Sequence, residues 1–351
     1  MAEENQTTHK RRVRYSGKYP KKFEEKYKEL QPEKYKDTIE HVIKKGNTPA
    51  GMHISIMVNE ILDFLKIQPG ETGFDATLGY GGHTKAMLQC LNGQGHIYAT
   101  DVDPEESART RKRLEEAGFG EDILTIRLQN FCTIDEIAKE AGGFDFILAD
   151  LGVSSMQIDN PKRGFSFKVD GPLDLRLNQE AGISAAERLA AITKDELAGM
   201  LYENSDEPYC EELAKAITDE IRKGNRIDTT TKLRNIIEKT LDFLPEKEKK
   251  DTIKKTCQRT FQALRIDVKR EFEVLYEFME KLPDALKPGG RAAILTFHSG
   301  EDKLVKKALK EGYRAGIYAD YAKDVIRPSA QECAQNGRAR STKMRWAIKA
   351  E

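Results

Sequence analysis

The sequence has few cysteines and no long apolar segment, and each absence argues against a class of protein. Its five cysteines lie far apart and include no Cys-x-x-Cys pair, which argues against a zinc site and against a disulfide framework. No run of about 18 uncharged apolar residues is present, which excludes a transmembrane helix. The segment 1–22 has no apolar core and is not typical of a secretory signal. We therefore expect a cytoplasmic protein.

The charges are numerous and unevenly distributed, although the formal net charge of the 351 residues is zero. Residues 1–52 carry 13 basic and 8 acidic groups, and residues 303–351 carry 12 and 5. Between them, residues 53–159 carry only 8 basic against 18 acidic groups. This pattern allows contact with nucleic acid at the two basic ends. Solvated basic tails are the alternative interpretation.

Short apolar runs alternate with helical patterns and predict an α/β fold. The expected strands are 72–78, 95–101, 123–128, 144–150 and 291–297, and the helices between them include 84–91 and 104–116. The fifth strand follows a turn at 287–290. Strands separated by helices are typical of a parallel, doubly wound sheet.

About 140 residues separate the fourth and fifth strands, whereas a crossover helix needs about a dozen. The gap therefore predicts an inserted helical domain, with capping boxes at Ser184–Glu187 and Thr193–Glu196. Amphipathic helices are expected at 208–223, at 230–244 and from about 254 to 282. The predicted domains are a basic extension (1–52), a sheet domain (53–157 and 258–351) and the insertion (158–257).

A glycine turn follows the first strand. Gly79, Gly81 and Gly82 allow close approach of the backbone to a ligand, and the helix that follows offers free N–H groups. The dinucleotide fingerprint would need glycine at Thr84, and so NAD and FAD fit poorly. A plain tight turn remains an alternative.

Polar groups follow the other strands, and all are expected at one edge of the sheet. Asp101 is placed to accept hydrogen bonds from two ribose hydroxyls, which predicts a ligand that contains adenosine. Asp103 is expected to cap the helix that begins at Pro104. Phe131 either packs on an adenine ring or belongs to the core. A carboxylate at Asp150, after an apolar strand, is costly unless it is used or paired.

Eight segments, in this order along the chain, match the sequence motifs of a known family. They are 53–60, 75–83, 101–104, 150–157, 160–176, 259–265, 297–302 and 338–341. Over about residues 53–348 the chain resembles the bacterial 16S ribosomal RNA cytosine-N4 methyltransferase family, also called MraW or RsmH. It departs from the family pattern at Tyr80, Met156 and Gly300, where arginine, proline and leucine are usual, and in its N-terminal extension. These departures indicate a divergent or paralogous branch.

The resemblance implies a Rossmann-like, class I methyltransferase that uses S-adenosylmethionine, and residues 158–257 are expected to be its substrate-recognition domain. No metal site is expected. It implies the N4 amine of a decoding-region cytidine as acceptor and 16S rRNA within the small ribosomal subunit as partner; whether the protein forms a homodimer stays open. The donor-site residues that it implies are Gly81, Gly82, His83, Asp101, Phe131, Asp150 and Gln157.

The acceptor side of the site is less specified. Asp150 either accepts an N4 hydrogen or serves the cofactor alone, and His298 either contacts substrate or is a satisfied strand-end histidine. A base that leaves its stack needs an aromatic or arginine platform. Arg163, Phe165 and Phe167 are the candidates, with the alternative that the two phenylalanines anchor their loop to the insertion.

Two other functions compete with methyl transfer. An NAD-dependent enzyme is disfavoured by Thr84. An RNA-binding or assembly factor without activity is disfavoured because the glycine turn, Asp101 and Asp150 are all present.

Overall fold

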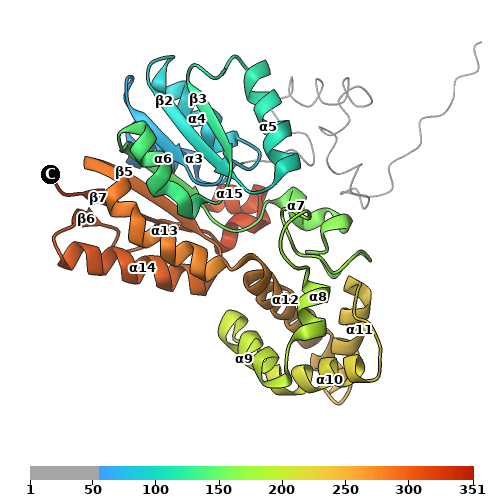
Figure 1. The fold of residues 1–351 in the computed structure, drawn as a ribbon. Helices are drawn as coiled ribbons and strands as arrows, with labels where there is room; N and C mark the ends of the chain where they lie inside the picture. Colours follow the sequence, from blue (N-terminus) through green and yellow to red (C-terminus); the bar gives the residue numbers. More distant parts are fainter. Residues whose placement is uncertain (1–54) are drawn as a thin grey trace, which may run out of the picture. The chain divides into compact units, whose positions relative to one another are not determined.

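The computed structural model describes residues 55–351, which contain a seven-stranded mixed sheet (Figure 1). The predicted basic extension, residues 1–52, lies outside the described residues. The strand order is β3-β2-β1-β4-β5-β7-β6. The strands are β1 (Thr72–Asp75), β2 (His96–Asp101), β3 (Leu124–Leu128), β4 (Phe144–Asp150), β5 (Leu286–Thr296), β6 (Tyr318–Tyr321) and β7 (Lys343–Lys349).

The predicted parallel arrangement is confirmed for β1 to β5. Sequence patterns did not predict β6 and β7, which extend the sheet as antiparallel strands beside β5. The expected turn at 287–290 lies inside β5, where the pairing jumps from Leu286 to Arg291 opposite β4. The turn signal therefore marks a bulge in a strand rather than its start.

Helices cover both faces of the sheet. One face packs against α3 (Val58–Leu65), α4 (Gly82–Leu91) and α5 (Pro104–Glu116), and the other against α6 (Ile134–Ala141), α13 (Glu271–Ala285) and α14 (Ser299–Arg314). Strand β4 serves both layers, because alternate side chains of a strand point to opposite faces. Phe146 and Leu148 enter one core, and Ile147 and Ala149 enter the other.

The chain between β4 and α13 is helical, with a hydrophobic core of its own. Its helices are α7 (Ser155–Asp159), α8 (Ala185–Ala191), α9 (Lys194–Ser205), α10 (Cys210–Arg222), α11 (Thr230–Thr240) and α12 (Glu246–Lys269). Both predicted capping boxes are present, at Ser184–Glu187 and Thr193–Glu196. No helix of the described chain has the length and apolar character needed to cross a bilayer.

The prediction of one helix from about 254 to 282 is wrong. Two helices, α12 and α13, meet at Arg270, whose φ of 51° is left-handed and ends the first helix. The apolar spacing continues from Leu264 to Leu275 on both sides of the break, and so a periodicity argument cannot detect it. The break turns the first residue of α13, Glu271, toward the edge of the sheet where the parallel strands end.

Candidate active site

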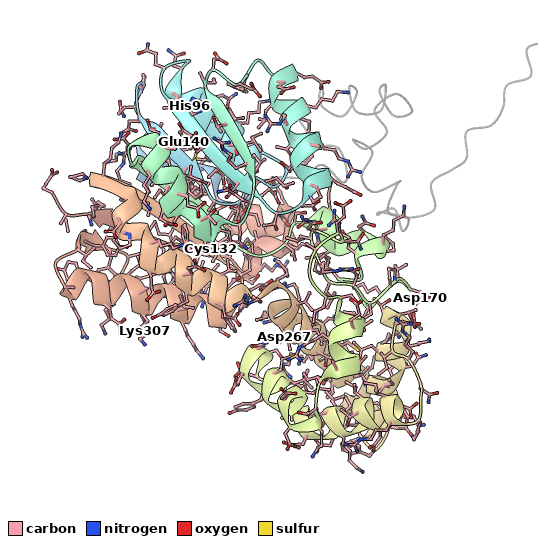
Figure 2. The ribbon with its side chains drawn as sticks, in the orientation of Figure 1. His96, Cys132, Glu140, Asp170, Asp267 and Lys307 are labelled. Carbon is pink, nitrogen blue, oxygen red and sulfur yellow. The ribbon has the colours of Figure 1, made fainter. Side chains whose placement is uncertain are left out.

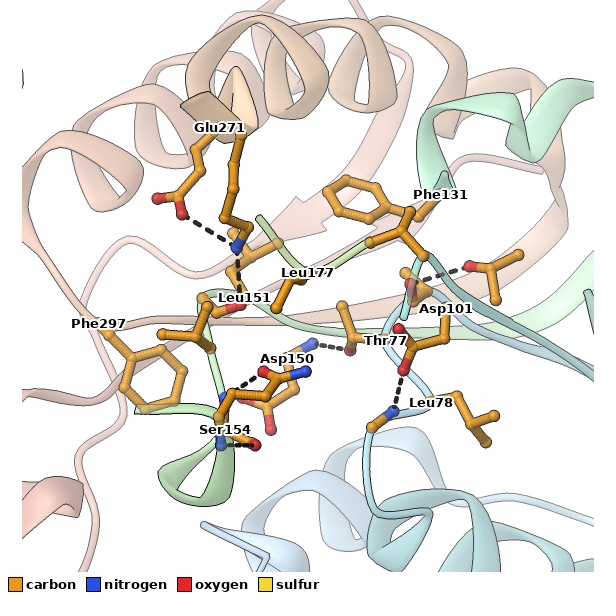
Figure 3. Close-up of a pocket in the computed structure, with 18 of the residues that line it drawn as sticks. Thr77, Leu78, Asp101, Phe131, Asp150, Leu151, Ser154, Leu177, Glu271 and Phe297 are labelled. Atoms are coloured by element: carbon orange, nitrogen blue, oxygen red, sulfur yellow. Dashed lines mark hydrogen bonds and ion pairs between the residues drawn. The ribbon is translucent and has the colours of Figure 1, made fainter. Parts of the chain in front are cut away.

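A cavity of about 620 Å³ lies at the carboxyl ends of β1, β2 and β4. This is the edge at which open α/β sheets bind ligands. Figure 3 shows Asp101 and Phe131 on one side of it and Glu271 and Phe297 on the other. All the residues proposed for the donor site line it, namely Gly81, Gly82, His83, Asp101, Phe131, Asp150 and Gln157.

The glycine turn is shaped by a segment that sequence reasoning did not connect with it. Gly81 has a φ of 81°, which favours glycine. At Gly82 an added Cβ would collide with Ser55 Oγ. Ser55 and Ile56 line the cavity too, and His83 Nε2 lies 2.9 Å from the carbonyl oxygen of Ile56. The turn is therefore covered by the chain that leads into α3.

Asp101 is oriented by two backbone donors. Its Oδ2 accepts from the N–H of Gly79 at 2.9 Å, and its Oδ1 accepts from the N–H of Asp103 at 2.8 Å. Burial raises the pKa of Asp101 to about 6. Asp103 also caps α5 as predicted, because its side chain accepts from the N–H of Glu106.

Asp150 has an unused acceptor. Its N–H donates to Thr77 Oγ1 at 2.7 Å, and its Oδ2 lies 3.5 Å from His83 Nδ1. Its Oδ1 has no hydrogen-bond partner within the described chain. Burial, with the charges of Asp75 and Glu301, raises the pKa of Asp150 to about 6. Asp150 lines the cavity, and a carboxylate of raised basicity in this position is suited to accept a proton from a bound molecule.

The wall opposite the glycine turn carries a network that the sequence did not reveal. Arg265 donates two hydrogen bonds to Glu271, at 2.9 and 3.0 Å, and Lys269 Nζ lies 3.0 Å from the same carboxylate. Against the effect of burial, these two cations hold the pKa of Glu271 well below its usual range. Lys269 also donates to the carbonyl oxygen of Gly152 at 3.2 Å. It thereby ties the end of α12 to the loop that follows Asp150 (Figure 3).

His298 lies behind this wall rather than among the residues that line the cavity. Its Nε2 is 3.2 Å from Glu301 and 3.8 Å from Glu271. Burial lowers the pKa of His298, but the two carboxylates outweigh burial and raise it to about 9. The three side chains are close enough for a metal site, yet Arg265 and a protonated His298 satisfy these carboxylates as an ion-pair network.

The proposed stacking platform is also away from the cavity. Arg163 is buried and lies 2.8 Å from Asp103 Oδ2. Phe165 belongs to the core of the insertion, and the ring of Phe167 lies 5.7 Å from that of Phe261. These contacts match the alternative interpretation, in which the two phenylalanines anchor their loop to the insertion.

Gln157 lines the cavity with its polar atoms already engaged. Its side-chain nitrogen donates to Asp103 Oδ2 at 3.0 Å, and its side-chain oxygen accepts from the N–H of Ser154. Asp103, which is fully buried, thus accepts hydrogen bonds from both Gln157 and Arg163. Arg163 in turn donates to the carbonyl oxygen of Leu177, another lining residue. The loop after β4 is thereby locked to the end of β2.

Comparisons with known proteins point to one family over most of the chain. The model of the MraW methylase family matches residues 50–350. Ribosomal RNA small subunit methyltransferase H 1 of Agathobacter rectalis is 86% identical over 351 residues, which cover 100% of both chains. The protein of the same name from Lachnoclostridium phytofermentans is 70% identical over 348 residues, covering 99% of this chain and 95% of its own. Ribosomal RNA small subunit methyltransferase H of Koribacter versatilis is 36% identical over 302 residues, 85% of this chain and 94% of its own.

Proposed function

The chain belongs to the MraW methylase family, and we propose from this that it methylates the RNA of the small ribosomal subunit. The methyl donor is S-adenosylmethionine, and the acceptor is the N4 amine of a cytidine in the decoding region of 16S rRNA, C1402. The reaction takes place in the cytoplasm, on the small subunit. The observation that carries the proposal is the carboxylate of Asp150, which lines the cavity and has one oxygen without a hydrogen-bond partner within the described chain.

The cavity fits the donor. Its volume of about 620 Å³ lies within the range of about 300–1,000 Å³ typical of small-molecule sites. Asp101, already fixed by two backbone N–H groups, has lone pairs left for ribose hydroxyls. Phe131 offers an aromatic face to the adenine, and Gly81 and Gly82 allow close approach of the backbone. When bound, S-adenosylmethionine supplies a methyl group activated by its sulfonium.

Asp150 then acts on the acceptor. The N4 lone pair of cytosine is delocalised into the ring, and so this amine is a poor nucleophile. A hydrogen bond from N4–H to the carboxylate of Asp150 localises the lone pair and stabilises the positive charge that develops as the new N–C bond forms. As that bond forms, the bond between the methyl carbon and the donor's sulfur breaks, its electron pair stays on sulfur, and a neutral thioether, S-adenosylhomocysteine, is left. The proton passes from N4 to Asp150 and then to solvent. A pKa of about 6 leaves Asp150 ionised near neutral pH while strengthening it as a base.

Lys269 and Arg163 position these groups. Lys269 holds the carbonyl oxygen of Gly152, two residues after Asp150. Arg163 and Gln157 hold the rest of the loop to Asp103, whose N–H orients Asp101. Donor-binding and acceptor-binding groups are thus fixed to one scaffold, as an in-line transfer between two bound molecules requires.

Purified protein tests the proposal when it is incubated with S-adenosylmethionine and small subunits that lack the modification. The expected product is N4-methylcytidine, identified by mass spectrometry of the digested RNA. Calorimetry should show binding of S-adenosylmethionine and none of NAD. Methylation of another base, or of free protein instead of RNA, would overturn the proposal.

A further inference from the structure

The outer face of α14 carries a row of cations that the chemistry above does not use. Five exposed basic residues form what we call the α14 stripe: Lys303, Lys306, Lys307, Lys310 and Arg314. At about 100° per residue they fall within an arc of about 100°. The buried side chains of the same helix, including Val305 and Leu309, lie on the opposite side. The stripe therefore points away from the sheet, as Lys307 does in Figure 2.

The charge of the α14 stripe is largely uncompensated. Within the described part of the chain, the only ion pair made by these five residues joins Lys307 to Glu311, at 4.0 Å. The other acids of α14, Glu301 and Asp302, are buried and contact His298 and the β7 cations Lys343 and Arg345. They do not reach the outer face. Among residues 55–351, four exposed cations of the stripe thus have no carboxylate partner.

The α14 stripe starts at the rim of the active site. Phe297 and Glu301, which flank the start of α14, line the cavity, and Lys303 follows within one turn. From Lys303 to Arg314 the helix rises by about 16 Å. A polyanion laid along this face would therefore reach the rim beside Asp150.

On one side of the α14 stripe, the neighbouring helix α13 exposes acidic side chains. Helix α13 packs along α14 (Figure 1) and exposes four acids, Glu273, Glu277, Glu280 and Asp284. Residues 53–159 are acidic as well, with 18 acidic against 8 basic groups. A polyanion approaching the cavity is repelled by both regions and attracted along α14. Such a pattern fixes the orientation in which a charged partner binds.

We propose that the α14 stripe binds the phosphate backbone of the small-subunit rRNA next to the nucleotide that is methylated. The inference rests on the proposed function and adds a docking surface to it. Flexible lysine side chains bind phosphates without reading sequence. This suits a surface that positions a folded RNA while the cavity selects the base.

A second row of lysines allows a matched comparison. Helix α12 exposes Lys247, Lys250, Lys254 and Lys255 in its first half, far along the helix from the cavity residues Arg265 and Lys269. Acids are interleaved with this row, and Lys255 pairs with Asp251 at 2.7 Å. The same number of lysines is therefore present in a setting that attracts phosphate less.

The experiment compares two variants of the full-length protein. One changes Lys303, Lys306, Lys307 and Lys310 to Gln, and the control changes Lys247, Lys250, Lys254 and Lys255 to Gln. Each variant loses four positive charges, and glutamine, the replacing residue, favours helices. Affinity for unmodified small subunits is measured over a salt titration, beside donor affinity by calorimetry. The α14 variant should bind subunits at least tenfold more weakly, with a log–log salt slope reduced by about two to four units.

The control variant should change subunit affinity by less than threefold, and donor affinity should be the same in all three proteins. Equal losses in the two variants, or a larger loss in the α12 variant, would overturn the inference. Failure of the proposed function would appear separately, as absence of methyl transfer by the wild-type protein. The binding comparison does not depend on that reaction.

Discussion

Two aspartates at strand ends are the groups whose ionisation the site depends on. Asp101 and Asp150 are both removed from water, and burial raises the pKa of each to about 6. Asp101 is compensated in part by the N–H groups of Gly79 and Asp103. Asp150 has less compensation, because one of its oxygens has no partner within residues 55–351. The protein thus keeps one carboxylate ready for a ligand at a cost in stability.

Replacement of Asp101 by alanine should weaken binding of S-adenosylmethionine by about 10- to 100-fold. Hydrogen bonds to a charged acceptor contribute about 1.5–3 kcal/mol. Calorimetry on the folded variant, checked by circular dichroism, measures the effect. Glu121→Ala, on the exposed surface before β3, is the control and should bind the donor normally. Unchanged affinity in Asp101→Ala would remove the proposed ribose contact.

Asp150→Asn should lower the single-turnover rate by at least 100-fold and change donor affinity by less than fivefold. The amide keeps the shape of the side chain but does not take up the N4 proton. For the wild-type protein, this rate should rise with pH and level off above about pH 6–7, as Asp150 ionises. A loss confined to donor affinity would instead assign Asp150 to the cofactor.

The same variant should be more stable than the wild-type protein in the absence of ligands. The folded-state pKa of Asp150 is raised above its unfolded value. The stability that a raised pKa contributes is present at low pH and is lost as the pH rises through about 6. Asp150→Asn should therefore show a higher Tm at pH 7.5, and the difference should vanish near pH 4. A lower Tm at both pH values would contradict this account of the site.

Sequence reasoning reached some of these side chains and missed others for a physical reason. Asp101 and Asp150 each end an apolar strand, and strand ends of a parallel sheet converge, so their positions followed from the pattern. Glu271 and Lys269 lie at a helix break that the pattern does not show. Arg163 was expected at the substrate, yet its partner Asp103 is 60 residues away in sequence. Such pairings arise from tertiary structure alone.

At the scale of elements, the local signals of the sequence were sufficient for most of the fold. Helix α5 and strand β4 have the predicted bounds, and both capping boxes formed. The antiparallel strands β6 and β7 were not predicted. The cover that Ser55 and Ile56 make over the glycine turn also depends on contacts remote in sequence. Local chemistry specified single elements, and packing decided what lies beside the cavity.

The contact between the glycine turn and the segment before α3 gives a prediction for this element. Gly82→Ala should weaken donor binding by a few-fold, because the new Cβ collides with Ser55 Oγ and forces this side chain at the cavity wall to move. Ser55→Gly in the same chain should restore much of the affinity, because it removes the colliding side chain. Calorimetry on the single and double variants provides the test. Failure of the double variant to recover would show that the collision is not the cause.

At the scale of the whole molecule, the uneven charge is the feature to explain. The acidic block over residues 53–159 should repel RNA, while residues 1–52 and 303–351 are basic. The α14 stripe provides part of the compensation. The N-terminal extension is predicted to provide another part, with Lys10, Arg11, Arg12 and Arg14 beside Tyr15 and Tyr19. Its structure lies outside the described residues.

Deletion of residues 1–45 should leave donor binding unchanged and weaken binding to the small subunit. The log–log salt slope should fall by about one unit for each phosphate that the shortened protein no longer neutralises. A salt titration with the full-length and shortened proteins measures both quantities. An unaltered slope and affinity would show that the extension is a solvated tail without a role in docking.

The central claim is tested most directly by mapping methylated nucleotides in 16S rRNA from cells that lack this protein. Mass spectrometry of rRNA fragments should show C1402 without its N4-methyl group in the deletion strain. Expression of the wild-type protein should restore the group, and expression of Asp150→Asn should not. Full N4-methylation of this cytidine in the deletion strain, or restoration by the Asp150→Asn protein, would contradict the account.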